Sequence, residues 1–264
     1  VDSLLLSQFS YMNLSAFEDE LKCENKIEIR ELLKAERFEK LMFHVRDTKS
    51  NMRLLYAMAS SPRWRNIKIG NFVEKLCDQS EEQFAAITVA LGDGRHFVAF
   101  RGTDGTLVGW KEDFNMAFTC PVPAQRLAAH YAASAMLRFP GEFLLGGHSK
   151  GGNLAVYAAA FCPAALQERI AAVYNNDGPG FDAEVIALPG YQRICARVQT
   201  FVPQSSIVGM LLEHEESYQV VRSSQVGLMQ HDGFSWQVQG PQFVHLSGLT
   251  EGGKIVDGAL REFV

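Results

Sequence analysis

The sequence predicts an α/β fold, a mostly parallel β-sheet with helices on both of its faces. Between residues 96 and 222, short apolar strand-like runs alternate with Ala-rich helical runs, as in the βα units of a parallel sheet. One of these strands ends in a tight Gly-rich turn that leads directly into a helix. The chain has 264 residues, of which 47% are hydrophobic and 21% charged, so it can bury such a sheet on both faces.

Residues 1–60 have a different pattern, because their apolar residues recur at three- and four-residue steps, as in Ile29, Leu32 and Leu33. This period predicts helices. No Pro- or Gly-rich linker separates them from the rest of the chain. We therefore expect a single domain over residues 1–264, with residues 1–60 as a helical N-terminal extension or cap.

The elements that follow are predicted from their period and their turn residues. The turn Gly92-Asp93-Gly94 between two β-rich runs predicts a hairpin of strands 83–91 and 96–100. The next strands are expected at 142–147, 170–176, 198–202 and 218–222. Helices are expected at 124–139, 153–161 and 206–213.

Composition excludes several classes of function. A formal charge of −5 gives no reason to expect a nucleic-acid partner. No apolar run reaches the ~20 residues of an integral membrane segment, and the first residues lack the pattern of a secretory signal. The five cysteines are scattered without C-x-x-C spacing, so we expect free thiols, a cytoplasmic protein, and no metal or cofactor. Composition carries no signal for oligomeric state.

The Gly-rich turn is the strongest chemical signal. In Gly147-His148-Ser149-Lys150-Gly151, a serine lies between an apolar strand and a small-residue helix. This is typical of a nucleophile elbow, in which a strained turn exposes the serine hydroxyl. Gly147 and Gly151 are expected because a Cβ at either position would clash with the neighbouring strand and helix. We predict Ser149 as the nucleophile of a serine hydrolase; the alternative is an ordinary strand-to-helix turn.

An oxyanion hole is predicted beside this serine. In α/β hydrolases, one donor is the N–H of the residue after the nucleophile, and the other comes from the loop after an early strand. Strand 96–100 leads into Arg101-Gly102-Thr103. The two N–H groups would here belong to Lys150 and Thr103.

The base is expected after the nucleophile, because the chain order in this fold is Ser, acid, His. Three histidines qualify: His214, His231 and His245. His231 follows strand 218–222 and a Gly-containing loop, where the base of this fold belongs. It is the predicted base, while His214 at a helix end and His245 within a strand remain alternatives.

Several motifs together resemble the class 3 lipases, and most of all their bacterial branch often called Mbeg1-like. They cover residues 80–240 and comprise Phe100-Arg101-Gly102-Thr103 with Trp110 and Asp113, the elbow with Gly152-Asn153-Leu154-Ala155, Asn176-Asp177-Gly178-Pro179-Gly180-Phe181, residues 202–209, and residues 230–236. The resemblance implies an α/β-hydrolase fold and a small-molecule or lipid acyl-ester substrate. It also implies that the Thr103 N–H and hydroxyl hold the oxyanion, that Asp113 supports that hydroxyl, and that His231 is the base. An ion pair of Arg101 with Asp113 is the alternative.

The acid departs from the class 3 pattern, which places an Asp-x-Val stretch after the strand matching 198–202. This chain has Ser206-Ile207-Val208 there. Asp177, at the end of the preceding strand, is the predicted acid. Asp182, Glu213 and Glu215 remain open, whereas Asp232 adjoins His231 and its side chain would point away from it.

These residues predict acyl-ester hydrolysis through a Ser149–His231–Asp177 triad and an acyl-enzyme intermediate. The displaced acid and the helical extension support an alternative from another class. In that alternative, the chain is a catalytically silent hydrolase-fold module used for binding or regulation.

Overall fold

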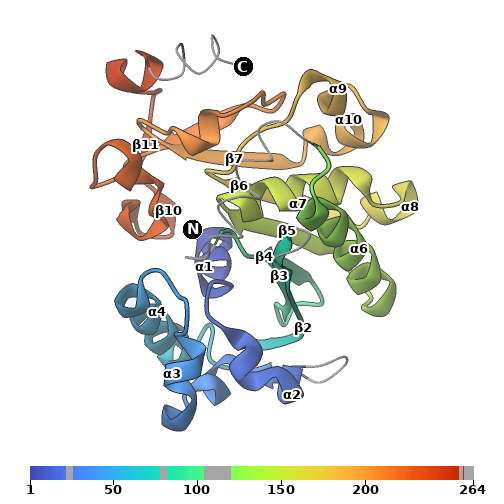
Figure 1. Ribbon diagram of the computed structural model, residues 1–264, viewed down its shortest axis with the longest axis vertical. Coiled ribbons are helices and arrows are strands. Elements are labelled where there is room, and N and C mark those ends of the chain that lie inside the picture. Colours follow the sequence, from blue (N-terminus) through green and yellow to red (C-terminus); the bar gives the residue numbers. More distant parts are fainter. Residues whose placement is uncertain (22–25, 78–81, 104–119, 256–257, 259–264) are drawn as a thin grey trace.

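A nine-stranded sheet runs through the computed structural model, which describes residues 1–21, 26–77, 82–103, 120–255 and 258 (Figure 1). The strand order is β1-β2-β3-β4-β5-β6-β7-β8-β11. The strands are β1 (Lys26–Glu28), β2 (Lys68–Cys77), β3 (Glu82–Ala90), β4 (His96–Phe100), β5 (Phe143–His148), β6 (Ile170–Asn176), β7 (Val198–Pro203), β8 (Tyr218–Val221) and β11 (His245–Leu246). A separate hairpin pairs β9 (Val238–Gln239) with β10 (Gln242–Phe243).

The centre of the sheet is parallel. Strands β4 to β8 all run in one direction, while β1 to β4 pair antiparallel, as do β8 and β11. The predicted α/β class is confirmed, with antiparallel additions at both edges. Because the carboxyl ends of parallel strands meet at one edge of a sheet, side chains that follow β4 to β8 lie near one another.

Helices cover both faces of the sheet. They are α1 (Asp2–Phe9), α2 (Glu18–Leu21), α3 (Phe38–Leu41), α4 (Thr48–Ser60), α6 (Pro123–Arg138), α7 (Lys150–Phe161), α8 (Ala164–Gln167), α9 (Ala183–Ile186) and α10 (Pro189–Cys195). Figure 1 shows α6 and α7 on one side, and α1, α3 and α4 on the other. Neighbouring residues of β4 divide between the two sides: Val98 and Phe100 pack into the cluster with α6 and α7, and Phe97 and Ala99 into the cluster with α1 and α4.

Among the described residues of the N-terminal segment, the elements are helical as predicted except for one strand. Strand β1 lies between α2 and α3 in the chain and pairs with β2. A strand of three residues shows too little alternation to be distinguished by its period. Because this strand belongs to the main sheet, the N-terminal segment contributes to the sheet as well as to its cover.

The predicted helix at 206–213 is wrong. The structure has only a 3₁₀ turn at Val208–Met210. The Ser206 hydroxyl accepts a hydrogen bond from the Gly209 N–H at 3.0 Å, and the Gly209 carbonyl faces the His214 ring at 2.8 Å. The Glu213 N–H, which a helix would direct to the Gly209 carbonyl, donates instead to the Phe181 carbonyl at 3.0 Å. This turn brings Ser206 and Gly209 beside the end of β6.

Candidate active site

Ser149 stands in a strained turn between β5 and α7. Its φ is 59° and its ψ is −134°, a left-handed backbone conformation that a non-glycine residue rarely adopts. The turn is held by a 3.0 Å hydrogen bond from the Ser149 N–H to the Asn176 carbonyl, and by a 2.8 Å bond from the Gly152 N–H to the Ser149 carbonyl. Strain of this kind is the geometry of a nucleophile elbow.

The two glycines that flank the serine have no room for a side chain. A Cβ on Gly147 would lie 2.1 Å from the carbonyl carbon and oxygen of Gly151, and a Cβ on Gly151 would lie 2.2 Å from the Phe100 carbonyl oxygen. Both distances are far shorter than atomic contact allows. The close crossing of β5, α7 and the end of β4 therefore depends on glycine at both positions.

The His231 ring contacts the Ser149 hydroxyl and comes from a segment that follows β8. It ends the 3₁₀ turn Gly227–His231, which follows β8 in the chain. Its Nε2 lies 2.9 Å from the Ser149 Oγ, and its Nδ1 lies 2.6 Å from the Asp177 Oδ2. The His231 side chain is 17% exposed, whereas that of Asp177 is fully buried. The structure thus brings the three predicted residues into one hydrogen-bonded chain.

Asp177 lies one strand before the position at which the class 3 pattern has its acid. It follows β6 directly and has a φ of 56°, while its N–H donates to the Phe201 carbonyl on β7 at 2.8 Å. Its Oδ1 accepts a 2.5 Å hydrogen bond from the hydroxyl of Ser206. Ser206 was not among the predicted site residues. The sequence offered one indication of it: Ser206 stands at the position where the class 3 pattern has the acid.

The hydrogen-bond partners determine the protonation of the His231 ring. A carboxylate only accepts, so Nδ1 carries the proton that is donated to Asp177. In the neutral ring, Nε2 then presents its lone pair to the Ser149 hydroxyl. The arrangement is able to withdraw the hydroxyl proton from Ser149 and to hold the resulting imidazolium against a buried carboxylate.

The predicted oxyanion donors lie on two segments that pack against each other. Lys150 begins α7, and Thr103 follows β4 after Gly102. A Cβ on Gly102 would lie 2.5 Å from the His148 carbonyl oxygen, so the backbone after β4 touches the elbow directly. The Lys150 side chain is buried and donates from Nζ to the main-chain oxygen of Gln83 at 2.9 Å and to its Oε1 at 2.5 Å. The Lys150 ammonium group is therefore bound to Gln83, while its N–H remains a predicted oxyanion donor.

The remaining candidates lie elsewhere or outside the described residues. Asp113 and Trp110 belong to a stretch that the structure does not describe, and Arg101 forms an ion pair with Glu74 at 2.7 Å. The alternative acids and bases have other partners or positions: Asp182 caps α9, Asp232 accepts from the Phe234 N–H, Glu213 and Glu215 are exposed, His214 pairs with Glu216, and His245 is exposed on β11.

A buried ion pair braces the segment that carries Ser206. The His214 Nδ1 lies 3.1 Å from the Glu216 Oε1, and the His214 Nε2 lies 2.8 Å from the Gly209 carbonyl oxygen. Glu216 and the Gly209 carbonyl, both acceptors, thus hold the His214 ring from its two nitrogen atoms. Glu216 also accepts hydrogen bonds from Thr200 at 2.5 Å and Tyr191 at 2.9 Å. Burial tends to raise the pKa of Glu216, but His214 and Thr200 outweigh it and hold that pKa below its ordinary value.

Replacing Glu216 with glutamine is expected to lower the free energy of unfolding by about 3 kcal/mol at pH 7, because it breaks a buried ion pair. The folded-state pKa of Glu216 is depressed, so its stabilisation is complete above its ordinary value of 4.5 and is lost as the pH falls through the lowered pKa. The difference between the two proteins should therefore shrink in acid. Urea unfolding at pH 7 and below pH 4.5 measures it. The exposed Glu251→Gln is the control and should unfold at the same urea concentration as the wild type at pH 7. An equal loss of stability in Glu216→Gln at both pH values would contradict the assignment.

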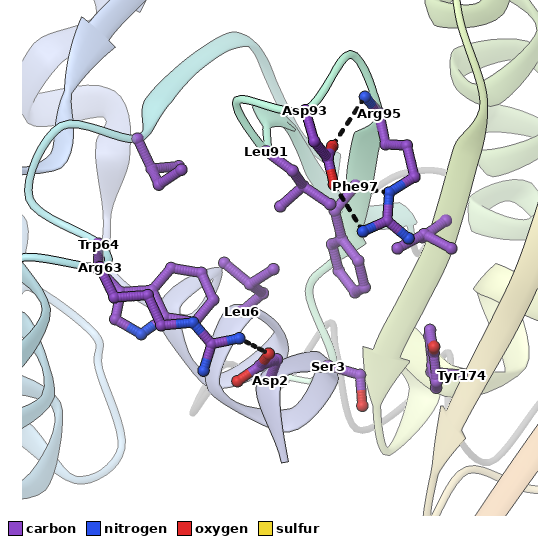
Figure 2. A pocket seen from close by; sticks show the side chains of 12 residues that line it. Asp2, Ser3, Leu6, Arg63, Trp64, Leu91, Asp93, Arg95, Phe97 and Tyr174 are labelled. Atoms are coloured by element: carbon purple, nitrogen blue, oxygen red, sulfur yellow. Dashed lines mark hydrogen bonds and ion pairs between the residues drawn. The ribbon is translucent and has the colours of Figure 1, made fainter. Parts of the chain in front are cut away.

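A cavity of about 300 Å³ lies away from this site (Figure 2). It is lined by Phe97 and Leu144, the second residues of β4 and β5, and so lies toward the amino ends of these strands, whereas Ser149 follows the carboxyl end of β5. Its two arginines are each ion-paired with an aspartate of the lining, Arg63 with Asp2 and Arg95 with Asp93. We assign this cavity no part in the chemistry at Ser149.

Comparison with known proteins places this geometry in context. The family model described as Mbeg1-like matches residues 58–264. Among solved structures, a mutant form of MDLA from Penicillium cyclopium superposes with a TM-score of 0.51 at 12% identity, over 95% of this chain and 86% of that one. The Rhizomucor miehei lipase in complex with its propeptide gives 0.42 at 14% identity, over 60% and 57%. At such identities the first likeness shows the fold alone. No curated relative matches.

Within the residues that the structure describes, no helix has both the length and the hydropathy that crossing a bilayer requires. In the same part of the chain, no cluster of three or more His, Cys, Asp or Glu side chains is arranged to hold a metal ion.

Proposed function

The chain belongs to the Mbeg1-like family, and from this premise we propose that it is a serine hydrolase that cleaves acyl esters. The observation that carries the proposal is the hydrogen-bonded chain from Ser149 Oγ to His231 Nε2 at 2.9 Å, and from His231 Nδ1 to Asp177 Oδ2 at 2.6 Å. The strained elbow and the lipase-like fold support it.

The proposed reaction has two steps. Ser149 Oγ attacks the ester carbonyl carbon while its proton passes to His231 Nε2, and Asp177 stabilises the imidazolium. The N–H groups of Thr103 and Lys150 are the proposed oxyanion donors. The tetrahedral intermediate collapses, the proton moves from His231 to the departing alkoxide, and an acyl-Ser149 ester remains. Water then attacks this ester with the same proton transfers, releasing the acid and restoring Ser149.

A small-molecule or lipid acyl ester is the proposed substrate class. The noncatalytic alternative drew on the displaced acid and on the helical extension, and the contact between Asp177 and His231 weighs against the first of these supports.

Labelling of the whole chain with a fluorophosphonate tests the proposal. We expect one phosphonyl group per chain, located on Ser149 by peptide mass spectrometry, because an activated serine attacks phosphorus as it attacks an ester carbonyl. Ser149→Ala should abolish the label. Ser205→Ala, whose hydroxyl is bonded to Thr250 and is not part of the triad, should retain it. A folded wild-type protein that takes no label and leaves short-chain nitrophenyl esters intact would contradict the proposal.

A further inference from the structure

The N-terminal segment reaches the elbow from outside the region that the family model matches, which begins at residue 58. Helix α1 packs against β5, the strand that leads to Ser149 (Figure 1). Two residues beyond α1, the Tyr11 hydroxyl lies 3.0 Å from the Nδ1 of His148. Tyr11 is therefore in direct contact with the residue that precedes the proposed nucleophile.

The same His148 ring also contacts His231. Its Nε2 lies 2.7 Å from the main-chain carbonyl oxygen of His231. A carbonyl only accepts, so the Nε2 of His148 carries a proton and donates it. The Nδ1 of the neutral ring then has a lone pair, which accepts the hydroxyl proton of Tyr11 at 3.0 Å, and the main-chain oxygen of His148 is a second, longer acceptor at 3.3 Å. The result is a directed chain from the Tyr11 hydroxyl through the His148 ring to the backbone of the proposed base.

The neutrality of His148 matters because it lies so close to the base. The centroids of the His148 and His231 rings are 4.7 Å apart. Burial, and secondarily the proximity of His231, lowers the pKa of His148 to about 3. A second cation at this distance would oppose the formation of imidazolium on His231. His148 thus provides a fixed N–H donor without adding a competing charge.

The same segment also touches the two loops that flank the elbow. A Cβ on Gly102 would lie 2.1 Å from the Tyr11 hydroxyl oxygen, so Tyr11 rests on the backbone just before Thr103. A Cβ on Gly233 would lie 2.6 Å from the Gln8 side-chain nitrogen, so α1 also rests on the loop that follows His231. Residues 8–11 are packed against the oxyanion loop, the elbow and the histidine loop together.

We propose that Tyr11 and His148 are positioning residues, which hold the backbone of His231 at the distance from Ser149 that proton transfer requires. The N-terminal segment is then part of the catalytic unit and not a cap over it. This inference rests on the proposed hydrolase activity of Ser149.

Steady-state hydrolysis of nitrophenyl esters by the whole chain tests the assignment. Tyr11→Phe should lower kcat about tenfold, the effect of one lost hydrogen bond, with little change in KM. His148→Leu, which removes both hydrogen bonds of the ring, should lower kcat about 100-fold. His148→Gln has its amide nitrogen the same number of bonds from the backbone as Nε2, so it should recover most of that loss. The exposed Tyr56→Phe on α4 is the matched control, with kcat within about twofold of wild type.

Two kinetic results would overturn the inference. One is that Tyr11→Phe and His148→Leu, shown to be folded by near-ultraviolet circular dichroism, keep the wild-type kcat. The other is that the kcat of His148→Gln is no higher than that of His148→Leu, which would mean that the His148 ring contributes only packing. A measurement without substrate distinguishes a failure of this inference from a failure of the proposed hydrolase function. Nitrogen NMR of the wild-type chain should show His148 as a neutral ring protonated on Nε2 between pH 5 and 8, whether or not the chain hydrolyses esters. Titration of His148 within that range, or the opposite tautomer, would also overturn it.

Discussion

Replacing His231 with alanine is expected to lower kcat for ester hydrolysis about 10⁶-fold, the loss that follows when the base of an interdependent serine–histidine pair is removed. His231 is the imidazole that meets the Ser149 hydroxyl, at 2.9 Å. The ring of His148 does not replace it, because its Nε2 proton is donated to the His231 carbonyl and its Nδ1 accepts from Tyr11. Initial rates with nitrophenyl esters, and the rate of fluorophosphonate labelling, measure the effect.

His245→Ala is the matched control for this variant. His245 was an alternative base in the sequence, and it lies exposed on β11. We expect its kcat to stay within about twofold of wild type. If the two variants lost activity equally, the assignment of the base to His231 would be wrong.

Replacing Asp177 with asparagine should lower kcat about 10⁴-fold, with the fold intact. The asparagine amide is able to donate to the His231 Nδ1, which then gives up its proton. The neutral ring would carry its proton on Nε2, facing the Ser149 hydroxyl, and the base would be lost although each atom stays in place. Steady-state kinetics measures the rate, and nitrogen NMR reports the tautomer of His231 directly.

Asp232→Asn separates this effect from the loss of any nearby carboxylate. Asp232 adjoins His231 but accepts a hydrogen bond from the Phe234 N–H at 3.0 Å, which an asparagine is also able to accept. We expect a change within about threefold. Full activity in Asp177→Asn, or a larger loss in Asp232→Asn, would move the acid away from Asp177.

Local patterns in the sequence were enough to predict the central sheet and the elbow. Strand β6 occupies the predicted residues 170–176, and α7 begins three residues before the predicted 153 because the turn at Ser149 leads straight into the helix. Apolar runs and glycine spacing are properties of neighbouring residues, so the sequence displays them. Ser149, His231 and Asp177 were selected by motif and chain order, and their contact in the structure supports roles that remain proposals.

Other features depend on residues far apart in the chain. The helix predicted at 206–213 is absent because its last residues pair with a distant segment: the Gly180 N–H donates to the Leu211 carbonyl, and Phe181 and Glu213 exchange two backbone hydrogen bonds. Nothing in the residues around Tyr11 indicates a contact with His148, which is 137 positions away. Such contacts follow from how the strands assemble, and no local period encodes them.

The separation of these residues along the chain has a consequence for folding. The bond between Ser149 and His231 closes a loop of 82 positions, and that between Tyr11 and His148 closes one of 137. Contacts between distant segments carry the larger entropy of loop closure and tend to form late. A chain that has formed β5 and α7 but has not yet docked its two ends would hold a serine with no base beside it. Under the proposed mechanism, a newly made or damaged chain would be inert toward esters until its last long-range contacts are in place.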